Sequence, residues 1–155
     1  MANWYGKART NYFKVIDPEK FREEMSEYSV TFIDSWRPRG DVPPVEEGEP
    51  PYFGLIAATE NGDWPSSVLQ EGVDENGDPR EDYVDIDFCE IVRPHLAEDQ
   101  VALFFTIGSE KARYLTGRVV AVVNTEDRDF LTLDLDEIYD RVHKEWGIKT
   151  SRAEY

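Results

Sequence analysis

The chain of 155 residues is poor in cysteine and histidine and contains no long apolar run. Cys89 is the only cysteine, which excludes an internal disulfide and fits a reducing compartment. Two histidines and one distant cysteine do not make a zinc site. No stretch approaches the roughly 20 apolar residues that span a bilayer, and the first six residues lack the pattern of a signal peptide. The sequence therefore predicts a soluble, cytoplasmic protein with no membrane partner, metal or other cofactor.

Motifs of catalysis are also scarce. The sequence has no glycine-rich phosphate loop, nucleophile elbow or dinucleotide fingerprint. Cys89 and His95 are six residues apart on a segment interrupted by Pro94, so we do not expect them to form a thiol nucleophile and its base. We expect Cys89 to be a small core residue and His143 to lie on the surface. These observations favour a protein that is not an enzyme.

Basic residues are few, and the acidic excess is unevenly distributed. Thirty-three acids oppose seventeen bases, for a net charge of −16. Residues 71–90 hold nine acids and one base, and residues 126–140 hold seven acids and one base, whereas the first sixteen residues contain three bases and no acid. Such a field repels nucleic acid and anionic membranes and attracts basic surfaces. The preferred partner is therefore a basic protein surface.

The apolar content is sufficient for a folded domain. Apolar residues make up 40% of the chain and aromatic residues 13%, too much for a disordered acidic segment. We expect one domain over residues 1–147, followed by a C-terminal tail at 148–155. The pattern predicts an α+β fold, with an antiparallel sheet of about five or six strands and two or three helices packed on one side.

The first half of the chain has clear local signals. Asp17 followed by Pro18 predicts a helix start, with the helix continuing to about residue 27. Strands are expected at 11–16, 30–36 and 52–59, and a loop rich in proline and glutamate at 38–51. Asn61-Gly62 predicts a tight hairpin turn that returns the chain to Leu69.

The second half begins with an acidic loop, expected at 71–82, that contains a second Asn-Gly turn at residues 76–77. A helix is expected to open at Asp85 or Asp87 and to be disturbed by Pro94. Two apolar strands at 101–107 and 114–123, joined by a basic turn at 108–113, are expected in the centre of the sheet. A half-buried strand from residue 131 then leads into a helix that stops at Gly147.

Some acidic residues have spacings that resemble metal sites. Asp74, Asn76, Asp78 and Asp85 stand at the first, third, fifth and twelfth positions of a calcium loop. The sixth position, which requires glycine for its bend, holds Pro79, so a flexible acidic loop is the favoured interpretation. The pairs Asp85 with Asp87 and Asp134 with Asp136 fit helix N-termini, where negative charge is favourable. The alternative is a hydrolase or nuclease that uses such aspartates with a divalent metal.

The acids of 71–82 and of 126–129 have no such local role. B-DNA presents about one negative charge per 1.7 Å of its axis, and rows of carboxylates on a folded protein can occupy a surface built for that array. The first hypothesis is therefore a non-enzymatic inhibitor or DNA mimic that binds a nucleic-acid-handling protein and does not contact nucleic acid itself. Ordinary solubility is the competing explanation. The proposed partner-binding residues are Asp74, Glu75, Asp78, Glu81, Asp82, Asp85, Asp87, Glu126, Asp127 and Asp129.

Self-association is a further alternative. The basic residues Lys7, Arg9 and Lys14 could meet the acidic segments of a second copy, which would give a homodimer. A structural, self-assembling role belongs to the same class of explanation.

Several short motifs are similar to those of a known group of proteins. They are Asn3-Trp4-Tyr5-Gly6, Ala8-Arg9, Asn11-Tyr12-Phe13, Trp64-Pro65-Ser66 and the run from Glu110 to Gly117. With these motifs the chain resembles small uncharacterised acidic proteins of bacterial phages, plasmids and other mobile elements. The resemblance implies a context and no site residues. Because mobile elements use small acidic proteins to block host restriction or CRISPR enzymes, it favours an anti-defence inhibitor.

Overall fold

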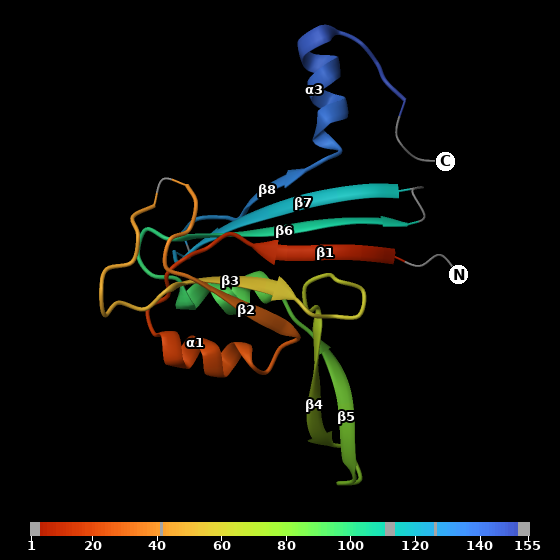
Figure 1. Cartoon of the computed structure of the whole chain (residues 1–155). Helices are drawn as coiled ribbons and strands as arrows, with labels where there is room; N and C mark the ends of the chain where they lie inside the picture. The colour runs from red at the N-terminus through yellow and green to blue at the C-terminus, as the bar shows by residue number, and fades with distance from the viewer. Residues whose placement is uncertain (1–3, 41, 111–113, 126, 152–155) are drawn as a thin grey trace.

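The computed structural model describes residues 4–40, 42–110, 114–125 and 127–151 (Figure 1). The strands are β1 (Trp4–Thr10), β2 (Val30–Ser35), β3 (Tyr52–Ala57), β4 (Ser67–Val73), β5 (Pro79–Asp85), β6 (Val101–Glu110), β7 (Tyr114–Val123) and β8 (Leu131–Asp134). The helices are α1 (Pro18–Met25), α2 (Phe88–Val92), the 3-10 turn η1 (Arg93–His95) and α3 (Glu137–Trp146). The described strands form a six-stranded antiparallel sheet in the order β2-β3-β1-β6-β7-β8 and a separate pair, β4-β5. The expected α+β fold is confirmed.

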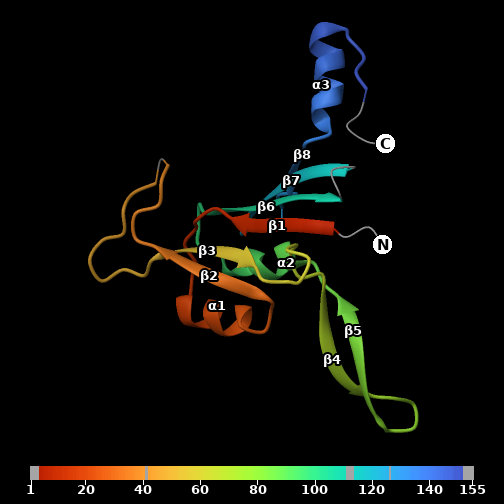
Figure 2. The ribbon, with the colours of Figure 1, turned by 45° about the vertical axis from the view of Figure 1, so that its right-hand side comes forward.

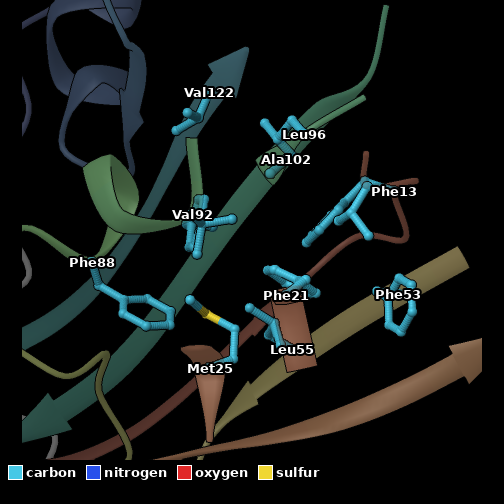
Figure 3. Packing of buried hydrophobic residues seen from close by; sticks show 12 residues of the cluster. Phe13, Phe21, Met25, Phe53, Leu55, Phe88, Val92, Leu96, Ala102 and Val122 are labelled. Carbon is cyan, nitrogen blue, oxygen red and sulfur yellow. The ribbon is translucent and has the colours of Figure 1, made fainter. Parts of the chain in front are cut away.

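One face of the large sheet carries the core. Helices α1 and α2 supply Phe21, Met25, Phe88 and Val92, which pack against inward side chains of the strands (Figure 3). Phe21 is fully buried, and its ring makes edge contacts with three other phenylalanine rings. Such edge-to-face pairs add to the free energy of burial. The core thus lies between this face and the two helices.

Helix α1 begins as its sequence predicts. The Asp17 carboxylate accepts hydrogen bonds from the backbone N–H groups of Glu19 and Lys20, at 3.1 and 3.0 Å. Pro18 takes the first helical position, where its missing N–H costs nothing. Phe21 and Met25 are four residues apart and therefore face the sheet together. The helix ends at Met25, slightly earlier than expected.

The first strand lies earlier in the chain than the expected 11–16. β1 is formed by Trp4–Thr10, and residues 11–16 make only isolated bridges at Phe13 and Val15. Asn11 explains the change, because its side-chain nitrogen donates to Val101 O at 2.9 Å and its side-chain oxygen accepts from Leu103 N at 2.8 Å. The amide thus takes backbone partners on β6 that a continued strand would need.

The two Asn-Gly turns have different outcomes. Gly62 has a φ of 74°, as the turn requires, but no strand returns beside β3, because β2 and β1 already occupy both of its edges. The expected acidic loop at 71–82 is wrong: these residues belong to the β4-β5 hairpin, whose strands pair from Ser67–Asp85 to Val73–Pro79. The turn at residues 76–77 forms the tip of this hairpin, with Gly77 at a φ of 84°.

The second half of the large sheet follows the expectation in part. β6 and β7 are interior strands and pair over ten residues. Residues 108–110 of the expected basic turn extend β6, and 111–113 lie outside the described residues.

β8 is exposed along its whole length, so its expected half-burial is wrong. Helix α3 ends at Gly147, as expected, with a φ of 71°. It rises away from the sheet and does not join α1 and α2 (Figures 1 and 2).

Candidate interaction surface

The β4-β5 hairpin, named here the acidic arm (residues 67–85), projects from the rest of the chain (Figures 1 and 2). Every residue of β5 is exposed, and β4 is exposed from Leu69 onward. A lone two-stranded hairpin is only marginally stable in water. The arm therefore depends on how its base is fixed to the domain.

Aromatic stacking fixes that base. The Trp64 ring stacks on Phe88 of α2, with 5.6 Å between centroids and 15° between planes, and meets the edge of Phe104 on β6 at 5.2 Å. Directly after the arm, Ile86 N donates to Ser66 O at 2.9 Å. The start and end of the arm are thus tied to each other and to the core.

The tip is a polar turn organised by Asp74. Its carboxylate accepts from the backbone N–H groups of Asn76 and Asp78, at 2.8 and 3.0 Å. These backbone hydrogen bonds, the one from Asp78 first, lower the pKa of Asp74 because they favour the charged form. The calcium-loop spacing has no geometric counterpart, since Asp85 lies at the far end of β5 from this turn.

Cross-strand register places carboxylates on both faces of the arm. Glu71 and Glu81 are directly opposite each other on one face, an arrangement of like charges that destabilises a sheet. On the other face, Asp82 forms a salt bridge with Arg80, Oδ2 to Nε, at 2.8 Å. On the face of Glu71 and Glu81, no basic side chain of the arm offsets the repulsion between the two carboxylates. This arrangement is unfavourable for the free chain and favourable toward a cationic partner.

The arm also exposes apolar side chains among its acids. Leu69 and Tyr83 are cross-strand partners on the same face as Glu71 and Glu81. Tyr83 is 76% exposed, and Val73 near the tip is 71% exposed. Tyrosine is enriched in the buried centres of protein interfaces. A cavity of about 630 Å³ at the base of the arm is lined by Tyr83, Trp64 and residues of the α1-β2 turn.

The second acidic segment lies apart from the arm. Asp127 and Asp129 lie in the β7-β8 connection, which follows Val123, and Glu126 lies outside the described residues. Val123 pairs with Val101 at the start of β6, whereas Asp63, just before the base of the arm, contacts Thr106 farther along that strand. The structure therefore brings the residues of 74–85 together on the arm and does not add Asp127 and Asp129 to it.

Arg93 holds the β7-β8 connection against η1. Its guanidinium donates to the carbonyl oxygens of Thr125 and Arg128 and lies over the Phe130 ring at 5.1 Å. It also pairs with Glu90 at 3.2 Å. This connection is thus held by a cation of the same chain whose side chain is 12% exposed.

Other acids and bases have local structural partners. Asp87 accepts from Cys89 N and caps α2, as expected for one of the two candidate capping residues. Asp134 faces Arg118 at 3.7 Å. At the basic N-terminal end, Lys14 pairs with Glu49 at 2.8 Å. That contact raises the pKa of Lys14, with the hydrogen bond that Lys14 Nζ donates to Glu49 as the largest cause.

Cys89 packs against the core, and burial raises the pKa of its thiol to about 12. A thiol with this pKa is a poor nucleophile at neutral pH, because the thiolate is the reactive form. His95 is buried under Phe21, and its Nε2 lies 3.0 Å from Glu24 Oε2 without hydrogen-bond geometry. Neither residue forms a hydrogen bond with the other's side chain within the described part of the chain.

Two features are absent from the described residues. Across residues 4–40, 42–110, 114–125 and 127–151, no three His, Cys, Asp or Glu side chains converge to hold a metal ion. In the same part of the chain, no helix has both the length and the apolar character needed to cross a bilayer.

No family model, curated protein or solved structure matches this chain.

Proposed function

We propose that this chain is a non-enzymatic interaction protein whose acidic arm binds a basic surface of a nucleic-acid-handling protein and occupies it in place of DNA. The observation that carries the proposal is the exposure of a projecting hairpin dense in carboxylates. Residues 71–87 contain eight acids and one base, and that base, Arg80, is paired within the arm.

The charge spacing of the arm supports a DNA-like role. At about 3.4 Å per residue, strands of seven residues extend about 24 Å. A net charge of −6, from seven acids and one base in residues 67–85, then gives roughly one charge per 4 Å. Phosphates on one strand of B-DNA follow each other at about 3.4 Å along the axis. A groove that accepts one DNA strand thus meets a similar line of charge on the arm.

The mixed chemistry of the arm supports binding to a protein in particular. Carboxylates accept hydrogen bonds from lysine and arginine, while Tyr83 and Leu69 supply apolar area that a purely solvating surface does not need. Within the proposal, the acids of the arm form the binding surface, and Asp127 and Asp129 contribute to the general field. The resemblance to proteins of mobile elements favours a host defence enzyme as the partner.

The test compares two triple variants that lose the same charge. One neutralises the arm with Glu71→Gln, Glu75→Gln and Glu81→Gln, and the other neutralises exposed acids elsewhere with Glu19→Gln, Glu23→Gln and Glu98→Gln. The immobilised chains capture proteins from a bacterial lysate, followed by elution with duplex DNA. We expect the wild type and the second variant to release DNA-binding proteins and the arm variant to capture at least tenfold less. Equal capture by both variants, or bound protein that duplex DNA does not elute, would overturn the proposal.

A further inference from the structure

Helix α3 presents an apolar side that nothing in the described chain covers. Its residues Ile138, Val142 and Trp146 recur at helical spacing on one side. Ile138 is 55% exposed and Trp146 is 70% exposed, and no residue of the helix is buried. An isolated helix of ten residues is marginal in water, because helices in proteins take most of their stability from packing their apolar side. This helix therefore needs an apolar surface to lie on.

The large sheet offers such a surface on the face opposite the core. The strand register places one set of outward-facing apolar side chains side by side on this face. They are Phe105 and Ile107 on β6, Val119 on β7, and Leu131 and Leu133 on β8. We name this set the open face. Ile107 is 59% exposed and Leu131 is 73% exposed. Exposed apolar areas of this kind mark interaction sites in soluble proteins.

The open face and α3 meet at an apolar groove of about 360 Å³. Phe105, Ile107 and Leu133 line it from the sheet, and Leu135 and Ile138 line it from the start of the helix. Leu135 N donates to Gly117 O at 2.8 Å, and its side chain sits over Gly117. This contact holds the first turn of α3 above its own sheet, so the rest of the helix does not lie on that face.

The exposed area is larger than a compact monomer of this size requires. The chain exposes 11439 Å², whereas compact monomers of 18.0 kDa expose about 8,000 Å². The projecting arm accounts for part of the difference. The excess of roughly 3,000 Å² still exceeds the area of about 800 Å² that each partner buries in a standard interface. An interface of standard size with a second copy therefore fits within the excess area that the chain exposes.

The border of the open face is basic. The charged side chains that register places on this face of β1 are Lys7 and Arg9, opposite Ile107 and Phe105. Neither forms a salt bridge with a described residue. On helix α3, Glu145 lies beside the apolar side and pairs with Arg141 of the same helix at 3.3 Å, while Asp140 lies on the opposite side. The basic border of the open face is therefore a feature of the sheet.

We propose that two copies of this chain form a two-fold dimer in which α3 of each copy lies on the open face of the other. Each chain carries both uncovered surfaces, so a two-fold dimer forms the same contact between α3 and the open face twice. The contact differs from the one that the sequence suggested, because it uses α3 and the open face in place of the acidic segments.

The experiment combines sedimentation velocity with complementation between two variants of the full chain. Leu133→Glu damages the open face and Ile138→Lys damages the helix, while Tyr83→Glu on the arm is the control. We expect wild type and control to be dimers at micromolar concentration and each damaged variant alone to dimerise at least tenfold more weakly. An equimolar mixture of the two damaged variants keeps one intact helix-on-face contact, so it should regain a dimer.

A monomeric wild type at 100 µM would overturn the proposal, and so would a dimer that neither variant weakens. Damaged variants that do not recover on mixing would also contradict the exchange of helices. Circular dichroism of each variant verifies that it is folded. The dimer should persist at high salt, because its contact is mainly apolar, whereas capture by the acidic arm should weaken. The two proposals can therefore fail independently.

Discussion

Gly117 and Leu135 are in close contact at the junction of β8 with α3. A Cβ atom built on Gly117 would lie 2.7 Å from Leu135 Cδ1, and the backbone N–H of Leu135 donates to Gly117 O at 2.8 Å. The absence of a side chain at Gly117 thus allows Leu135 to sit on β7. This contact sets the direction in which α3 leaves the sheet.

The first prediction concerns this contact. Gly117→Ala should push Leu135 away and change the direction of α3, with a loss of about 1–2 kcal/mol of unfolding free energy from overpacking. It should also weaken self-association. The matched control is Gly72→Ala, whose added Cβ has only an ordinary contact with Arg80 O at 4.0 Å. Urea denaturation and sedimentation velocity measure both effects, and equal behaviour of the two variants would contradict the prediction.

A second prediction concerns Asn11, which ends β1. Asn11→Ala removes two hydrogen bonds to the backbone of β6 and leaves Leu103 N and Val101 O without those partners. We expect a loss of about 1–3 kcal/mol of unfolding free energy, because these two backbone groups then lack the hydrogen bonds that replace their hydrogen bonds to water. Gln70→Ala on the exposed arm should change the urea midpoint little. An Asn11→Ala midpoint equal to that of wild type would show that the amide is not needed.

A third prediction concerns the pH dependence of stability through Cys89. Its pKa is about 12 in the folded chain, against an ordinary 9.0. Between pH 9 and 12 the unfolded chain loses this proton while the folded chain keeps it, so the free energy of unfolding falls as pH rises through that window. Below pH 9 the contribution is complete.

The measurement compares wild type with Cys89→Ala at pH 8 and pH 10.5. Other titrating groups are common to both chains, so their effects cancel. The wild type should lose about 1 kcal/mol more of unfolding free energy over this interval, which is less than the full linkage slope because the thiol is partly exposed. Parallel curves for the two chains would show that the thiol titrates normally.

Local sequence signals predicted those parts of the fold that local chemistry determines. Asp17 with Pro18 identified the start of α1, Gly147 the end of α3, and the apolar runs of β6 and β7 their central place in the sheet. The first two depend on interactions within a few residues along the chain, and the third follows from the length of the apolar runs. Such interactions are visible in a single sequence.

The sequence predictions are wrong where contacts between residues far apart in the chain decide the structure. Phe13 and Val15 alternate as a strand does, but the contacts of Asn11 with β6 place the real strand before them. Asn76-Gly77 is a local signal for a hairpin turn, but residues 71–82 have few apolar side chains, and the cross-strand pair of Leu69 with Tyr83 lies just outside them. The sequence does not predict the exposure of β8 and α3. An apolar pattern indicates that residues are buried, but it does not indicate whether the covering surface belongs to the same chain or to another.

The proposed partner-binding residues were selected from charge alone, and their arrangement in space was not predictable from it. Asp74, Asp78 and Glu81 come together because the β4-β5 register brings the two strands side by side. Asp127 follows β7 at the other end of the large sheet. Charge density along a chain carries no information about which acidic segments become neighbours.

The proposed function depends most on whether the acidic arm takes the place of DNA, and a competition measurement tests this directly. Fluorescence anisotropy follows a labelled duplex bound to a purified DNA-binding protein captured by the chain, while the chain is added at low salt. We predict that wild type and the Glu19/Glu23/Glu98 variant displace the duplex and that the Glu71/Glu75/Glu81 variant displaces it at least tenfold less effectively. A duplex that stays bound while the chain also binds, or equal displacement by both variants, would contradict the account.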